Sequence, residues 1–254
     1  MIVRESNDYY SVAKQHDHAI LSGDIASHFK DDTFIDSTYR DDVLLAIREH
    51  DRGWIRLDET PVWNDREHVP FSFIDYPMHA KLPHYTIGIN EVEEMSSYAA
   101  LLCSLHYTSF TPIRNSSHPD CIAYMKHEAD RQRRMLKKLN LQADRDGDLI
   151  SHHLRLLQLC DELSLYVCLN RPGATKIEEH PWYKEAFDTT IQDQSLTAKW
   201  MNEHKIWLHP FPFKGDFKVS IPMKHVSKEM RTQLGIEKAY RETGFEMQEV
   251  TFVD

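Results

Sequence analysis

The sequence lacks the features that mark membrane and secreted proteins. No apolar run approaches the roughly 18 residues of a transmembrane helix, so no membrane partner is expected. The opening residues, MIVRESNDYY, do not follow the basic-then-apolar pattern of a secretory signal. The four cysteines form no CxxC pair, and three of them lie inside apolar helical patterns, where cysteine acts as a small core residue. These observations predict a cytoplasmic protein.

Positive charge is also scarce, since the formal net charge is −10 at pH 7. Proteins that bind nucleic acids usually present a basic face to the phosphates, so we expect no nucleic-acid partner. The basic run RQRRMLKK, residues 131–138, is typical of a solvated helix face. A patch that receives a phosphorylated small molecule is the alternative. P-loop, Rossmann and nucleophile-elbow motifs are missing too, which disfavours those enzyme classes.

The 254 residues are enough for one large domain, and we predict a single domain over 1–254. Helical periodicity predicts five helices, at 9–29, 39–51, 96–110, 118–140 and 148–170. The last is apolar on nearly every side and should be the central helix. Four prolines and scattered aromatic residues in 52–95 predict a long packed loop, inserted into a helical core over 8–171.

The pattern changes after Pro172. The segments KIWLHPFPF, DFKVSIPMKHV and FEMQEVTFVD show the partial alternation of strands, separated by turn residues. They predict a small antiparallel sheet in a C-terminal appendage, 172–254, to which the N-terminal MIVRE could add a strand. The predicted fold is therefore mainly α: a helical bundle with a small C-terminal antiparallel β-sheet, α+β in class.

Polar residues interrupt two of the apolar helical stripes. In AIREHDRGW, residues 46–54, His50 and Asp51 directly follow the apolar positions of a helix. Asp161 lies within a leucine stripe of the most apolar helix. A buried carboxylate without a partner is costly or becomes protonated, so an arginine or a metal ion is expected beside it. The first helix could supply a third group, but periodicity does not choose between His16 and His18.

Two resemblances bear on these residues. LLAIREHDRGW resembles the apolar-helix, HD, glycine signature of the HD-domain superfamily of metal-dependent phosphohydrolases. His18, which lies 32 residues before His50, and Asp161 in a late apolar helix add to that resemblance. The phrases QHDHAILSG, EHDRGW, YAALLCSLH and LLQLCDELSLYVCLNRPG resemble more closely, and nearly end to end, a bacterial family of unassigned function, the domain of unknown function 3891.

The superfamily resemblance implies an HD-domain-like helical bundle with the metal ligands His18, His50, Asp51 and Asp161. The cofactor would be a divalent ion, Mn, Fe, Ni, Zn or Mg, which would activate water and polarise a phosphoryl oxygen. The implied function is hydrolysis of a small phosphorylated molecule or nucleotide, with Asp51 and His106 as catalytic residues. The alternatives are an HD-type di-iron oxygenase, a non-catalytic binding or regulatory module, and, for the residues themselves, a structural polar network.

Substrate-binding residues are predicted by position. Trp54 and Asp58 directly follow the HD motif and should line the pocket mouth under the inserted loop. Arg131 begins the basic run, where an ion-pair ladder with Glu128 is the alternative. Arg171 follows the last helix, where it either caps that helix or reaches a substrate phosphate. The expected partner is a phosphorylated small molecule, and the sequence is compatible with a homodimer.

Overall fold

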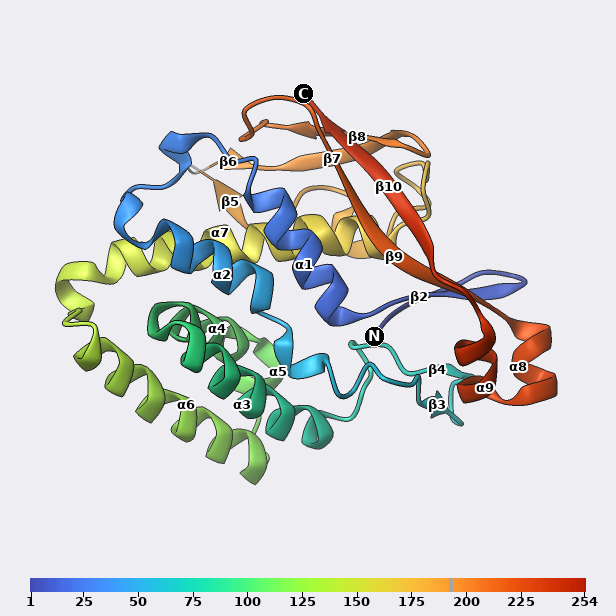
Figure 1. Ribbon diagram of the computed structural model, residues 1–254, viewed down its shortest axis with the longest axis horizontal. Coiled ribbons are helices and arrows are strands. Elements are labelled where there is room, and N and C mark those ends of the chain that lie inside the picture. The colour runs from blue at the N-terminus through green and yellow to red at the C-terminus, as the bar shows by residue number, and fades with distance from the viewer. Residues whose placement is uncertain (192–193) are drawn as a thin grey trace.

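Residues 1–191 and 194–254 are described by a computed structural model, in which a layer of helices packs against a six-stranded sheet (Figure 1). The helices of the layer are α1 (Gln15–Ala26), α2 (Arg40–Glu49), α3 (Met78–Met95), α4 (Ser97–Ser109), α5 (Thr111–Arg114), α6 (Pro119–Lys138) and α7 (Ala143–Leu169). Short 3₁₀ turns are η1 (Asp31–Thr33), η2 (Ser37–Tyr39), η3 (Arg52–Trp54) and η4 (Pro181–Tyr183).

The sheet has the strand order β1-β2-β9-β10-β8-β7. Its strands are β1 (Ile2–Glu5), β2 (Tyr9–Ala13), β7 (Thr197–Asn202), β8 (Lys205–His209), β9 (Phe217–Ser227) and β10 (Glu246–Val253). β10 runs parallel to β8, and the other pairs are antiparallel. Helices α8 (Lys228–Leu234) and α9 (Ile236–Glu242) connect β9 to β10. Two-stranded pairs, β3 (Trp63–Asn64) with β4 (Val69–Pro70) and β5 (Thr190–Ile191) with β6 (Gln194–Ser195), lie in the connecting loops.

The predicted architecture, a mainly α HD-domain-like bundle with a small C-terminal antiparallel sheet, is wrong. The fold is α+β, and its sheet is large, mixed, and built from both ends of the chain. The long strand β9 makes this possible, because it pairs with β2 at one end and with β10 along much of its length. Such pairing over more than 200 residues leaves no trace in local periodicity.

Two predicted elements also differ. Residues 9–13 are the strand β2 rather than the start of a helix, which agrees with the strand preference of the tyrosines and valine in YYSVA. The segment 52–95 is not a loop throughout, because α3 occupies Met78–Met95 with Pro83 inside it. The helix buries Leu82, Tyr85, Ile89 and Val92, whose packing offsets the hydrogen bond that a proline removes.

Helix α7 is central, as predicted. It contacts α1, α2 and α4, and in Figure 1 it runs behind α1 and α2 through the middle of the molecule. Its apolar residues from Leu156 to Cys168 are almost all buried. Ser96 caps α4, since its Oγ accepts the N–H of Ala99 at 3.1 Å. All four cysteines are buried and free. No helix in the described parts of the chain has the length and apolar content needed to cross a bilayer.

Candidate metal centre

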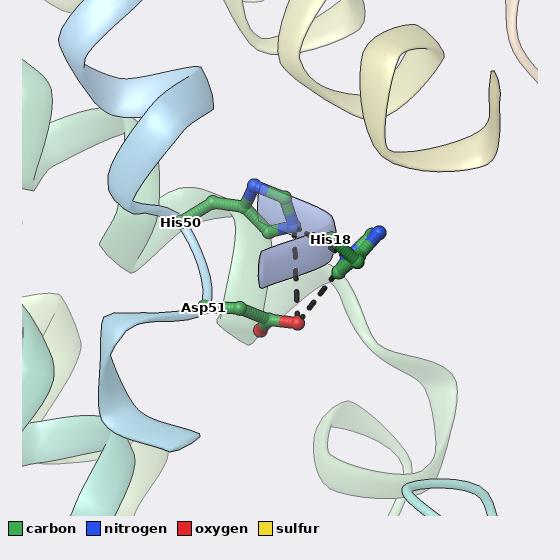
Figure 2. Close-up of side chains that lie close together, drawn as sticks. All are labelled: His18, His50 and Asp51. Atoms are coloured by element: carbon green, nitrogen blue, oxygen red, sulfur yellow. Dashed lines mark hydrogen bonds and ion pairs between the residues drawn. The ribbon is translucent and has the colours of Figure 1, made fainter. Parts of the chain in front are cut away.

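Helices that are far apart in the chain bring their polar residues to one point. His18 comes from α1, His50 is the residue that ends α2, and Asp51 follows it directly. Asp161 comes from the middle of α7, and His106 from the last turn of α4. Figure 2 shows the side chains of His18, His50 and Asp51 turned toward one another. The sequence pattern therefore singled out residues that do meet in space.

The backbone after α2 is fixed by a close contact between two glycines. A β-carbon at Gly88 in α3 would clash with the backbone nitrogen of Gly53, and one at Gly53 would lie 2.7 Å from the carbonyl oxygen of His84. The missing side chains let η3 press against α3. That contact sets the direction in which Asp51, two residues before Gly53, leaves the helix end.

The two histidine Nε2 atoms lie close to each other and to both carboxylates. His18 Nε2 lies 3.1 Å from His50 Nε2, 3.4 Å from Asp51 Oδ2 and 3.2 Å from Asp161 Oδ1. His50 Nε2 lies 3.5 Å from Asp161 Oδ1 and 3.9 Å from Asp51 Oδ2. Ligand atoms about 2.1 Å from a metal ion sit roughly 3.0–3.4 Å apart in octahedral or tetrahedral geometry. The observed separations are at or slightly above that range.

Hydrogen bonds to the other ring nitrogens assign the histidine tautomers. His50 Nδ1 lies 2.7 Å from the carbonyl oxygen of Ile47, which can only accept, so this nitrogen carries a proton. His18 Nδ1 lies 2.5 Å from Ser164 Oγ, and this nitrogen is taken as the donor because Ser164 Oγ can donate its own proton to the carbonyl oxygen of Asp161 or to Ser22 Oγ. Both histidines consequently direct an unprotonated Nε2, in the neutral form, at the centre of the cluster.

The carboxylate of Asp51 is held by donors on its outer side. Tyr107 Oη donates to Oδ1 at 3.1 Å, and Gln15 Nε2 donates to Oδ2 at 2.9 Å. Both donors are buried, as is Asp51 itself. Tyr107, Gln15 and Ser164 were not predicted from the sequence. Nothing in the local pattern separates these polar residues from others on buried helix faces.

The cluster is built to hold positive charge. Burial lowers the pKa of His18, but hydrogen bonds to Asp161 and Asp51 outweigh burial and raise that pKa to about 9. Burial raises the pKa of Asp161, while its contacts with His18 and His50 outweigh burial and take that pKa well below its usual range. The carboxylates thus remain ionised and bind either a proton on His18 or another cation.

His106 stands beside this group of four. Its Nε2 lies 3.5 Å from Asp161 Oδ2, the oxygen that faces away from His18 and His50, and its Nδ1 has no hydrogen-bond partner. Burial lowers the pKa of His106 to about 4, which keeps the ring neutral at pH 7. With Nδ1 unpartnered, His106 is not a fully hydrogen-bonded core histidine.

A pocket of about 460 Å³ opens on the cluster. Asp51, Asp161 and His106 contribute to its lining, whereas His18 and His50 are buried behind the carboxylates. Much of the wall is aromatic or aliphatic. Lys81 and Glu162, which no sequence motif indicated, also line it. Burial raises the pKa of Glu162 to about 7, although hydrogen bonds from Thr189 oppose the shift.

The structure decides between His16 and His18, because His16 lies outside the cluster with its Nε2 3.9 Å from Glu49.

Trp54 lines the pocket as predicted, and it is 1% exposed. Asp58 does not line the mouth. It is fully buried and accepts the backbone N–H of Gln15, so it anchors the start of α1.

The two predicted substrate-binding arginines are not at the pocket. Arg131 is buried and forms ion pairs with Glu128 and Glu93, which join α6 to α3. The ion-pair alternative is therefore the right one, although the pair is buried and not on the surface. Arg171 is exposed, and its Nη2 lies 3.4 Å from Glu178. Helical spacing placed Arg131 on a helix and Arg171 just after one, but it did not reveal which residues lie beside them.

The chain belongs to the family described as protein of unknown function DUF3891, because the model of that family matches residues 1–228. No curated protein and no solved structure matches the chain.

Proposed function

We propose that this member of the DUF3891 family is a metal-dependent hydrolase of small phosphate esters. One divalent ion would be held by His18, His50, Asp51 and Asp161. These residues agree in type and in chain order with the ligands of the HD-domain phosphohydrolases that the sequence resembles. The proposal concerns the site only, since the architecture around it is not the predicted helical bundle.

The observation that carries the proposal is that an oxygen of Asp51 and an oxygen of Asp161 both approach the facing Nε2 atoms of His18 and His50. The Nε2 atoms of His18 and His50 are acceptors in the neutral tautomers, and the facing oxygens of Asp51 and Asp161 are acceptors as well. A proton on His18 can bond only one or two of these atoms well. A metal ion can contact all four, so it satisfies the cluster better than a proton does.

The donor set also narrows the choice of metal. Two imidazoles with two carboxylates suit Mn, Fe, Ni or Zn, whereas Mg prefers oxygen ligands and retained water. Such an ion, when bound, supplies Lewis acidity and makes water a nucleophile near neutral pH. The protein positions the ion through Ser164, Ile47 and Tyr107, which orient its ligands, and directs the carboxylate side of the cluster toward the pocket.

A di-iron oxygenase has weaker support. A second ion would use His106 and the outer oxygen of Asp161, which lie in a second potential metal group with His50. His50 already directs its Nε2 at the first position. Within residues 1–191 and 194–254, no further histidine, cysteine or carboxylate joins that second group. A single ion therefore agrees better with the ligands at hand.

Metal analysis and an assay test the proposal together. The purified protein should contain about one Mn, Fe, Ni or Zn per chain, and it should hydrolyse p-nitrophenyl phosphate. Asp161→Asn should remove the metal and the activity. Asp148→Asn is the matched control, because Asp148 is an exposed residue of the same helix. Two irons per chain would favour the oxygenase, and a protein that never binds metal would favour the non-catalytic module.

A further inference from the structure

Lys81 is a buried cation in an otherwise acidic pocket. It lies in α3, is 6% exposed, and is the only lysine or arginine among the described residues that line the pocket around the cluster. The carboxylates of Asp51, Asp161, Glu162 and Asp188 line the same space. None of the carboxylates in the described chain forms an ion pair with the Lys81 ammonium.

The hydrogen bonds of Lys81 are only partly used. Its Nζ donates to the carbonyl oxygen of Phe73 at 2.9 Å, and it lies 6.0 Å from the centre of the Trp54 ring. An ammonium group carries further N–H donors. A buried charge without an opposite charge beside it is unfavourable, so an anionic ligand group in this pocket would relieve the cost.

The mouth of the pocket is aromatic and apolar. Phe73 lies in the loop before α3 and Trp182 in the turn η4, and their rings meet edge to face with centroids 6.2 Å apart. Ile74 and Trp182 line the pocket while remaining 51% and 49% exposed. Single exposed apolar residues are common on protein surfaces, but a group of them beside a pocket suggests a ligand surface. A bound apolar group would cover it.

Groups that could recognise a sugar or a base are scarce. Among the described lining residues, the neutral amide and aliphatic hydroxyl side chains are those of Gln15 and Thr111. The Gln15 amide nitrogen is already bonded to Asp51. A sugar or a base would therefore depend mainly on charged groups such as Glu162 and Asp188 for its hydrogen bonds, whereas an apolar group needs none.

We infer that the pocket takes a phosphate monoester of an apolar, ring-sized alcohol. Its phosphate group lies between the metal centre and Lys81, and its apolar group lies against Phe73 and Trp182. A volume of about 460 Å³ accommodates a ligand of that size. The inference rests on the proposed function for the bound metal. The binding of an anion by Lys81 does not depend on the metal, because the ammonium group belongs to the protein.

Equilibrium binding of phenylphosphonate tests this inference, because the probe resembles the substrate and cannot be hydrolysed as an ester. Calorimetry should show that Mn-loaded protein binds phenylphosphonate at least about tenfold more tightly than methylphosphonate. Lys81→Met should weaken phenylphosphonate binding by at least about tenfold, and Lys81→Arg should retain most of it. Lys126→Met is the matched control, since Lys126 is exposed on α6 and outside the pocket.

Trp182→Ala tests the apolar part on a half-exposed residue whose loss should not prevent folding. It should remove the preference for phenylphosphonate and leave methylphosphonate binding unchanged. Unchanged affinity in Lys81→Met would overturn the anion site and leave Lys81 as a tether for the Phe73 loop. Equal affinities for the two probes in the wild-type protein would overturn the apolar specificity.

The same measurement separates the two proposals. The protein could fail to bind metal or hydrolyse esters and yet, after EDTA treatment, still bind phenylphosphonate through Lys81. That result would reject the proposed function and support the anion site. If the metal-loaded protein is active and Lys81→Met does not change its affinity for phenylphosphonate, the proposed function is supported and the anion site is rejected.

Discussion

His18 Nε2 and His50 Nε2 face each other at 3.1 Å, although the residues are 32 positions apart and belong to different helices. Their rings are nearly perpendicular, with an interplanar angle of 89°. Each ring directs Nδ1 at an oxygen atom, Ser164 Oγ for His18 and the Ile47 carbonyl oxygen for His50. Two lone pairs so oriented repel each other unless a cation lies between them, and this relationship gives the first prediction.

Metal binding should release a proton at neutral pH. The pKa of His18 in the metal-free protein is about 9, so at pH 7.5 an incoming ion displaces its proton. Calorimetry in buffers of different ionisation enthalpy should show about one proton released per ion, with affinity rising toward pH 9. Binding without proton release would contradict the raised pKa of His18.

The metal-free protein should lose stability as the pH rises. The pKa of His18 is raised from its ordinary 6.5 to about 9, so its contribution is fully present below 6.5 and is lost as the pH passes through 9. The melting temperature of EDTA-treated protein should therefore fall across this window. His18→Ala should show a smaller fall over the same range, and an identical fall would assign the effect to other groups.

Ser164→Ala should weaken metal binding without removing a ligand. It deletes the acceptor that orients His18, and loss of such a partner typically costs about 10- to 100-fold in metal affinity. Ser151→Ala, at an exposed position of the same helix, is the control. Titration with Zn or Mn checks both variants, and equal affinities would mean that Ser164 does not orient the ring.

Gly88→Ala should disturb the metal centre from a distance. The new β-carbon would meet the backbone at Gly53, so η3 must move and carry Asp51 with it. Overpacking of this kind costs about 1–3 kcal/mol of unfolding free energy, and metal affinity should fall as well. Gly147→Ala is the control, because nothing lies within 4 Å of its added β-carbon. Chemical denaturation and metal titration check both variants. Unchanged stability and metal affinity in Gly88→Ala would contradict the prediction.

Arg131→Ala should destabilise the fold and spare the pocket. It leaves Glu128 buried without its ion-pair partner, which typically costs about 3–5 kcal/mol. Urea denaturation should detect this loss, and phenylphosphonate affinity at low temperature should stay near that of the wild-type protein. Selective loss of phosphonate binding at unchanged stability would restore Arg131 as a substrate residue.

Local sequence identified most of the helices and singled out His50, Asp51 and Asp161 of the candidate site. Helical periodicity depends on neighbours within one or two turns, so it located α2, α4 and α6 closely, and it found α7 but began it at Asp148 instead of Ala143. It also exposed Asp161 as a carboxylate in an apolar stripe. The same method missed α3, because Pro83 and nearby aromatic residues masked its regular buried stripe, and with it Lys81.

The sequence by itself indicated that several polar residues lie on apolar helix faces, where burial without a partner is unfavourable. Only the tertiary structure decided that His18 and not His16 joins them, since the side of α1 that faces α2 and α7 depends on packing. It also decided that Arg131 and Asp58 support the fold, and that both chain ends share one sheet. These outcomes depend on contacts between segments that are far apart in the chain. Local periodicity reports only on neighbouring residues, so it cannot predict such contacts.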